Sequence, residues 1–258
     1  MVRKIVTLTS DFGGDSPYAS AMRGVILSRC EDVIIHDVCH AVPAFDVLAG
    51  AYVVWVGTST YPATSVHVVV VDPGVGSDRG RLIASADGAY YVAPDNGVLS
   101  YVLARSRRVQ AWIVDDPIWF GEHVSPTFEG RDVFAWLAAH LINGRSPQDM
   151  GAPLARPQVL TSAFVQATSD GSARGRVIWI DGLGNLVTNL TPPFGDQSWQ
   201  LLVGGRWRAP HARTYSDVGR GEALAYEGSM GLIEIGIRDG NAAQTLGLSL
   251  GSEVTLLP

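Results

Sequence analysis

The sequence predicts an α/β domain with a parallel sheet, followed by a smaller domain built mainly of strands. Two observations lead to this fold class. Up to about residue 165, apolar strand-like runs alternate with segments of helical spacing, the order typical of parallel α/β sheets. Beyond that point, short apolar runs are separated by turn residues, which indicates a small β-barrel or β-sandwich.

In the first part, strands are expected at 4–10, 33–38 and 65–71, and a hairpin over 81–97. Helices are expected at 18–29, 46–57 and 131–144, the last ending at Asn143-Gly144. The four valines from Val68 to Val71 form an uninterrupted apolar run, as in strands buried on both faces.

In the second part, the expected strands are 176–181, 185–190, 199–205, 206–210, 223–228, 232–237 and 252–258, with helical signal only near 241–247. The segment 166–175 is polar and contains glycine, so it is expected to be a linker. We therefore predict an N-terminal domain of residues 1–167 and a C-terminal domain of residues 168–258.

Composition excludes several classes of protein. The 19 Lys and Arg residues against 25 Asp and Glu residues give a net charge of −6 without a basic cluster, which argues against a nucleic-acid partner. No run approaches the roughly 18 apolar residues of a membrane span, and no signal peptide is visible, so a cytoplasmic protein is expected. Cys30 and Cys39 lack the paired spacing of a zinc site and are expected to be free thiols.

Two acids, Asp11 and Asp72, each end a strand-like run and precede a turn that contains glycine. Ligands of open α/β sheets bind beyond the carboxyl ends of the strands, so these acids could hold ribose hydroxyls, a cation or a metal. Aspartate also begins turns and caps helices without any further role. The nearby segments 95–97 (Asp-Asn-Gly) and 131–132 (Arg-Asp) favour a functional site.

Gly74 and Gly76 follow Asp72, but their spacing matches neither a P-loop nor a dinucleotide-binding fingerprint. We expect them to let the chain turn tightly or approach a ligand closely. The histidines show no metal-binding spacing, and no metal is expected.

Six segments together resemble one family. They are 7–26 (TLTSDFGGDSPYASAMRGVI), 71–79 (VDPGVGSDR), 91–100 (YVAPDNGVLS), 127–132 (TFEGRD), 181–189 (DGLGNLVTN) and 227–243 (EGSMGLIEIGIRDGNAA). In this order they resemble the S-adenosyl-L-methionine (SAM) hydroxide adenosyltransferases, whose superfamily includes the fluorinase and the chlorinase. The resemblance extends from about residue 4 to the C-terminus.

The resemblance implies an N-terminal α/β sandwich domain and a C-terminal β-barrel domain. It also implies a homotrimer that binds SAM between the N-terminal domain of one subunit and the C-terminal domain of a neighbour. The implied reaction is attack of water or hydroxide on C5′ of SAM, which gives adenosine and L-methionine without a further cofactor.

The resemblance also assigns roles to residues. Asp72, Arg79 and Glu129 occupy the positions of the water-activating set. Asp11 would hold the ribose hydroxyls, and Phe45 and Phe128 would form apolar walls near the reacting carbon. The remaining substrate-binding positions are Asn96, Gly130, Asp181, Asn185, Tyr215, Ser229, Met230, Glu234, Asn241 and Ala242.

One departure from the family pattern bears on catalysis, because Glu129 stands where the family motif has histidine. Glu129 could take the place of histidine as the proton acceptor. Alternatively, it could pair with Arg79 or Arg131 and only order its loop. Lesser departures are Leu183, where an aromatic residue is common, and Met230.

Other functions stay open at the level of sequence. A halide-using relative is disfavoured by Asp72, which stands where the halogenating enzymes have tyrosine and would repel an anion. The change at Glu129 leaves open a protein that binds SAM or adenosine without turnover. A metal-dependent hydrolase would use Asp11, Asp15 and Asp72 as ligands.

Overall fold

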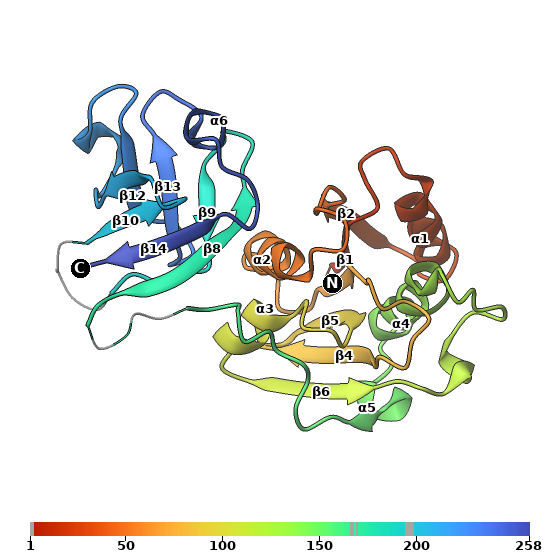
Figure 1. Cartoon of the computed structure of the whole chain (residues 1–258). Coiled ribbons are helices and arrows are strands. Elements are labelled where there is room, and N and C mark those ends of the chain that lie inside the picture. Colours follow the sequence, from red (N-terminus) through yellow and green to blue (C-terminus); the bar gives the residue numbers. More distant parts are fainter. Residues whose placement is uncertain (1–2, 166–167, 169, 194–198) are drawn as a thin grey trace. The chain divides into compact units, whose positions relative to one another are not determined.

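The computed structural model describes residues 3–165, 168, 170–193 and 199–258 (Figure 1). The chain divides into two domains, one ending at Leu160 and the other running from Thr161 to Pro258. The expected boundary between 167 and 168 lies beside residues 166, 167 and 169, which are outside the described part. The expected linker 166–175 is too long, because Ala173 already begins a strand and pairs with Leu256.

The N-terminal sheet has seven strands in the order β2-β1-β3-β5-β4-β6-β7. They are β1 (Lys4–Ser10), β2 (Val33–Cys39), β3 (Val66–Val70), β4 (Arg81–Ala86), β5 (Ala89–Pro94), β6 (Val109–Ile113) and β7 (Ala152–Pro153). Strands β2, β1, β3 and β5 are parallel, as expected, but β4, β6 and β7 run antiparallel to their neighbours. The expected parallel pairing therefore holds for four of the seven strands, because the β4–β5 hairpin reverses the chain.

Helices cover both faces of this sheet. They are α1 (Pro17–Leu27), α2 (Val47–Thr58), α3 (Ser100–Arg105), α4 (Ala135–Ile142) and α5 (Pro147–Met150). Met22 and Ile26 of α1 share one core with Val68 and Val70 of β3 and with the apolar residues of α4. On the opposite face, a Cβ on Gly50 of α2 would lie 3.0 Å from Val71. This arrangement confirms the α/β sandwich.

A π-helical turn, Gly130–Phe134, leads directly into α4. The expected helix 131–144 is therefore present, but its first turn is wider than an α-helical turn. Gly130 is packed tightly, since a Cβ there would lie 3.3 Å from the sulfur of Met22 and 3.4 Å from the ring of Phe12. The start of this helix is thus fixed against α1 and the end of β1.

The C-terminal domain contains all seven expected strands. They are β8 (Ala173–Ile180), β9 (Leu186–Thr188), β10 (Gln200–Val203), β11 (Trp207–Pro210), β12 (Ala223–Glu227), β13 (Ile233–Ile237) and β14 (Glu253–Leu257), with the short helix α6 (Ala242–Leu246). The order is β11-β10-β14-β8-β9-β13-β12. His211 and Ala225 form a bridge that brings the two edges together, and the interior holds Leu186, Leu201 and Ile235. The sheet is nearly closed, which confirms the β-barrel.

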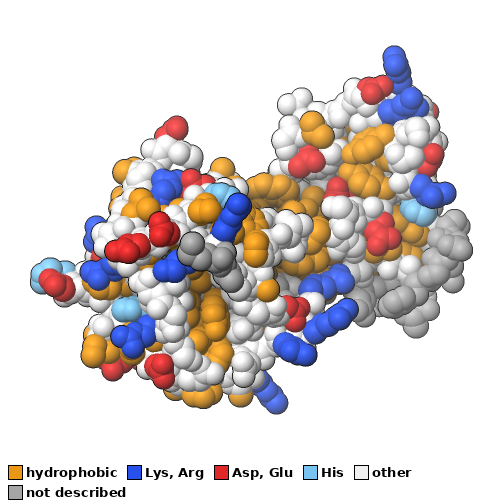
Figure 2. All heavy atoms as spheres, turned by 180° about the vertical axis from the view of Figure 1, so that it is seen from behind, with side chains coloured by type: hydrophobic (Ala, Val, Ile, Leu, Met, Phe, Trp, Pro, Cys, Tyr) orange, Lys and Arg blue, Asp and Glu red, His pale blue; other side chains and the backbone are white. Residues whose placement is uncertain are grey.

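The surface carries mixed charges. Figure 2 shows acidic and basic side chains interspersed with apolar ones over the visible face. Among the described residues, no helix is long and apolar enough to cross a membrane.

Candidate active site

The five residues of β3 are all buried, and Asp72 follows the strand after one further buried residue, Val71. The side-chain amide of Asn96 donates to the carbonyl oxygen of Val71 at 2.9 Å, which fixes the chain just before Asp72. Arg79 donates from Nε to both carboxylate oxygens of Asp72 at 3.0 Å, and Nη2 of Arg79 also contacts Oδ2. The strand therefore delivers an acid whose side chain is 4% exposed and is held by one guanidinium group.

The loop from Asp72 to Arg79 depends on Gly76 more than on Gly74. Gly76 has a φ of 78°, and a Cβ there would lie 2.6 Å from the carbonyl oxygen of Pro126. Gly74 does not have a positive φ, and its nearest neighbour would be 3.4 Å from an added Cβ. The positive φ of Gly76 fits the expected tight turn, and its contact with Pro126 brings the loop against the segment that carries Glu129. A close approach of either glycine to a ligand stays a prediction.

Glu129 precedes the π-helical turn and is 2% exposed. Its Oε2 accepts a hydrogen bond from Nη2 of Arg79 at 2.5 Å. Its Oε1 accepts from Nη2 and Nε of Arg81 at 2.5 and 3.2 Å. The expected pairing with Arg79 is confirmed, and the alternative pairing with Arg131 is wrong because Arg131 pairs with its neighbour Asp132. The role of Glu129 as proton acceptor stays a prediction.

Arg79 lies at the centre of this ion cluster. Burial alone would lower its pKa, but the hydrogen bonds and charges of Asp72 and Glu129 outweigh burial and raise it. Its Nη1 is buried and has no hydrogen-bond partner among the described residues. A buried donor without a partner is costly, so Nη1 is the group of this cluster whose hydrogen bonding is incomplete.

Asp72 and Glu129 also line a cavity of about 220 Å³ in the N-terminal domain. Asp11 is the third acid of the cavity, and the rings of Phe12, Phe45 and Phe128 line it as well. The cavity therefore combines carboxylates with aromatic walls, which suits a ligand that has both hydroxyl groups and apolar parts.

The backbone around Asp11 is arranged unusually. Oδ2 of Asp11 accepts a hydrogen bond from the backbone N–H of Phe45 at 2.9 Å. Phe45 has a φ of 66°, and the residue is 71% exposed. A bulky residue in this conformation is rare and clusters at functional sites. The exposed ring is thus held at the cavity by Asp11 rather than by apolar packing.

Sequence reasoning missed Phe12, which lines the cavity, and Tyr18, which packs behind the aromatic wall. Phe12 and Tyr18 pack edge-on against Phe128, with ring centroids 6.0 and 4.9 Å from it. Both lie in the same segment as Asp11, within 7–26, so their place in the family motif is the signal that could have found them.

Asn96 does not line the cavity. Besides holding Val71, it accepts a hydrogen bond from the backbone N–H of Val98 at 3.1 Å. It therefore positions the end of β3. The cluster Asp11, Asp15 and Asp72 does not form a metal site, because no group of three or more His, Cys, Asp or Glu that could hold a metal occurs in the described residues.

In the C-terminal domain, four of the expected residues join one chain of hydrogen bonds. Asn185 donates to Asp181 at 2.8 Å and accepts from the hydroxyl of Tyr215 at 2.9 Å. The hydroxyls of Tyr215 and Tyr226 lie 2.8 Å apart, and Tyr226 donates to Glu234 at 2.9 Å. Tyr226 was not predicted, because nothing in the sequence pattern separates it from the other residues of β12.

Glu234 is a carboxyl group of this network whose pKa is shifted. Burial raises its pKa, and the charge of Asp181 adds to the rise, against the hydrogen bond from Tyr226. The same burial raises the pKa of Tyr226. The network therefore holds a carboxyl group that gains a proton more readily than an ordinary glutamate.

The other expected residues of this domain lie around the network or in the core. Asn241 caps α6 by accepting from Gln244 N at 2.8 Å, and its side chain lies against Gly184. Ser229 and Met230 occupy the turn between β12 and β13, next to Gly228, where a Cβ would collide with Glu234. The side chain of Ala242 is fully buried in the core of the domain.

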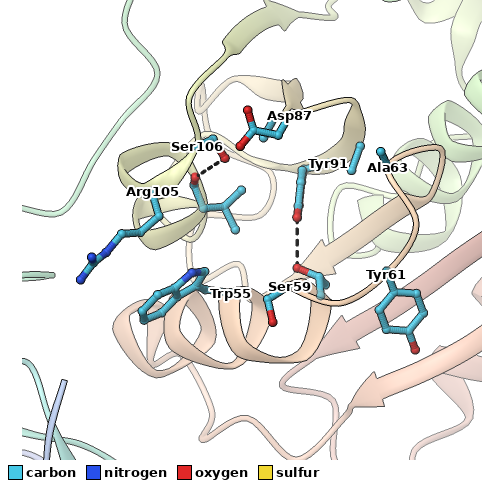
Figure 3. A pocket seen from close by; sticks show the side chains of 12 residues that line it. Trp55, Ser59, Tyr61, Ala63, Asp87, Tyr91, Arg105 and Ser106 are labelled. Atoms are coloured by element: carbon cyan, nitrogen blue, oxygen red, sulfur yellow. Dashed lines mark hydrogen bonds between the residues drawn. The ribbon is translucent and has the colours of Figure 1, made fainter. Parts of the chain in front are cut away.

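A second cavity, of about 320 Å³, lies at the amino ends of β3 and β5, away from Asp72 (Figure 3). Its main polar groups already have partners. The hydroxyl of Tyr91 lies 3.1 Å from that of Thr58, and the carboxylate of Asp87 accepts from the backbone N–H groups of Arg107 and Arg108. Among the described residues that line this cavity, no buried side-chain N or O atom lacks a hydrogen-bond partner.

Comparison with known proteins shows which protein family the chain resembles. Residues 6–151 match the SAM hydroxide adenosyltransferase N-terminal domain, and residues 175–255 match the C-terminal domain. A Thermus thermophilus protein named (R)-S-adenosyl-L-methionine hydrolase is 36% identical, over 98% of this chain and 99% of its own length. A Nocardia brasiliensis protein named fluorinase is 30% identical, over 98% of this chain and 96% of its own length.

A solved structure agrees with these sequence matches. The crystal structure of a conserved protein from Thermotoga maritima has a TM-score of 0.86 at 31% identity, and the match covers 98% of this chain and 100% of that chain. The chain therefore belongs to the SAM hydroxide adenosyltransferase family.

Proposed function

We propose that this protein is an enzyme that hydrolyses SAM to adenosine and L-methionine. Its membership of the family and the names of its relatives support this activity. The observation that carries the proposal is that Asp72 and Glu129 line the cavity and share the guanidinium group of Arg79, whose Nη1 is buried and has no partner among the described residues. A donor in that position suits an oxygen nucleophile.

In the proposed reaction, the water oxygen forms a bond to C5′ while the bond from C5′ to sulfur breaks. The electron pair of that bond stays on sulfur, so the sulfonium leaves as the neutral thioether of methionine and needs no proton. Nη1 of Arg79 orients the nucleophile, and Asp72 takes its proton. Because attack by hydroxide on a sulfonium neutralises charge, the aromatic walls of the cavity favour it by excluding other water.

The remaining site residues are assigned by the same proposal. Asp11 holds the ribose hydroxyls, and Phe45 and Phe128 enclose the reacting carbon. The network of Asp181, Asn185, Tyr215, Tyr226 and Glu234 recognises the polar groups of adenine and methionine. The C-terminal set of one subunit completes the cavity of a neighbour in a homotrimer, which light scattering on the purified protein would test.

We further propose that the reaction requires no cofactor or metal and takes place in the cytoplasm. Cys30 and Cys39 are free thiols, which suits a reducing compartment. Full turnover in the presence of a strong chelator would support the first point. Fractionation of the source cells would test the second.

The deciding experiment is incubation of the purified protein with SAM in water enriched in heavy oxygen, without halide. Adenosine that carries the heavy oxygen, together with an equal amount of methionine, supports the proposal. Tight SAM binding without adenosine would instead indicate a binding protein. Turnover that appears only when chloride or fluoride is added would indicate a halide-using enzyme.

The variant Asp72→Asn tests the mechanism itself. It keeps the shape of the side chain but removes the proton acceptor. We expect kcat to fall by about 100-fold or more, with SAM binding largely retained. Unchanged kcat would remove Asp72 from the reaction.

A further inference from the structure

Arg81 holds the residue by which this chain departs from its family motif. It donates to Oε1 of Glu129 from both Nη2 and Nε, while Arg79 donates to Oε2. We propose that Arg81 is a positioning residue. Its positive charge neutralises Glu129, and Glu129, which stands where the motif has histidine, can then hold Arg79. The inference rests on the proposed function, because Arg79 is the arginine that orients water in the proposed reaction.

The charges of the cluster give the reason. Asp72, Arg79, Glu129 and Arg81 form a continuous chain of ion pairs that alternates in sign and sums to zero. With a neutral histidine at position 129, Asp72 and Arg79 would balance without Arg81. The glutamate therefore adds one negative charge, and Arg81 supplies the matching positive charge.

Without Arg81, two buried carboxylates would share one guanidinium group. Their side chains are 4% and 2% exposed, so water could not screen them effectively. Like charges this close favour uptake of a proton by one of them. A protonated Glu129 would hold Arg79 less firmly, and a protonated Asp72 could not accept a proton from water.

The backbone directs Arg81 toward this position. Arg79 and Arg81 are two residues apart, so in extended chain their side chains lie on the same face. Gly80 between them must stay small, since a Cβ there would lie 2.6 Å from Cδ1 of Ile113. Arg81 begins β4 and pairs with Pro94 of β5, which fixes its Cα position.

Glu129 is the dominant partner of Arg81. Asp115 is 3.9 Å away and its side chain is 75% exposed, so that contact is weak. On the helix of Glu129 itself, Arg131 and Asp132 neutralise each other. Among the described residues, the charged groups that contact Glu129 or line its cavity are Asp72, Arg79, Arg81 and Asp11, and Asp115 contacts only Arg81.

The test compares Arg81→Met in two backgrounds, the natural chain and Glu129→His. Adenosine release from SAM is measured from about pH 5 to about pH 9, with SAM binding measured in parallel. In the natural background, Arg81→Met should lower kcat by about 30-fold and move the acid limb of the profile up by about one pH unit. In the Glu129→His background, the same change should alter kcat by less than about threefold.

Two further variants separate charge from structure. Arg81→Lys keeps the positive charge and should restore most of the kcat lost in Arg81→Met. Arg107→Met removes an exposed arginine near the other end of β4 and should leave the profile unchanged. An equal loss of kcat in both backgrounds, or an unshifted pH profile in Arg81→Met, would overturn the proposal.

Folding gives a readout that does not depend on the reaction. If the unaltered protein releases no adenosine, the proposed function fails, but the coupling between Arg81 and Glu129 can still be read from thermal unfolding of the same variants. Rescue of Arg81→Met stability by Glu129→His supports charge compensation. If both Arg81→Met proteins unfold alike, Arg81 serves packing and the inference is wrong.

Discussion

His67 provides a quantitative test of the fold around β3. It is 1% exposed, and its Nδ1 lies 2.8 Å from the hydroxyl of Thr7. Its Nε2 is buried and has no hydrogen-bond partner in the described part of the chain. Burial therefore disfavours the charged imidazolium and lowers the pKa of His67 from 6.5 to about 4.

The size and sign of the effect follow from proton linkage. A fall from 6.5 to about 4 corresponds to about 3 kcal/mol, at 1.36 kcal/mol per pKa unit. Because the folded-state pKa is depressed, the unfolded chain binds the proton more readily. The contribution of neutral His67 to stability is therefore complete above about pH 6.5 and is lost as the pH falls toward about 4.

The assay is urea unfolding of the unaltered protein and of His67→Gln at several pH values between about 7.5 and 4.5. Glutamine keeps a polar group near Thr7 but does not titrate. Over this range, the free energy of unfolding of the unaltered protein should fall by about 2–3 kcal/mol more than that of the variant. Parallel curves for the two proteins would refute the reasoning.

Three further predictions concern other elements. Gly76→Ala should lose about 1–3 kcal/mol of stability and about tenfold in turnover, because its Cβ meets the Pro126 carbonyl at a φ of 78°; unchanged melting and turnover would contradict this. Burial raises the pKa of Glu234, so its ionisation as the pH rises destabilises the fold. Glu234→Gln should therefore lose less stability with rising pH, while its amide oxygen still accepts from Tyr226. Melting curves at several pH values above about pH 4.5 test this, and an equal pH dependence of the two proteins would contradict it. Phe45→Ala should leave melting unchanged, since Phe45 is 71% exposed, but should raise KM for SAM by about tenfold. An unchanged KM in steady-state kinetics would show that the ring is only a surface residue.

Parts of the fold could be predicted because the local pattern and the tertiary environment agree. The valine run before Asp72 became β3 because it is apolar on both faces, and helices pack on each side of the sheet. The hairpin over 81–97 was expected, but the sequence does not show which of its two strands joins β3; in the structure this strand is β5. Strand β6 was missed since Val109 and Gln110 are exposed and give no clear alternation.

The site was predictable where its residues end a strand or match the family motif. Asp11 and Asp72 do both, and they line the same cavity. Arg81 gave no signal, because an arginine at the start of a strand is ordinary until Glu129 is placed beside it. Asn96 lies in the motif, but it secures Val71 instead of lining the cavity. Only the tertiary contacts separate such supporting residues from residues that face a ligand.

The π-helical turn Gly130–Phe134 makes the site sensitive to chain length as well as to residue identity. Each residue in a helix advances the side-chain direction by about 100°. Deletion of one residue from this turn would let an ordinary α-helix form and leave the packing of α4 intact, but it would rotate Glu129 away from both arginines. In an alignment of family members, a one-residue gap in this turn would therefore mark a change in chemistry, even where the aligned residue types are the same.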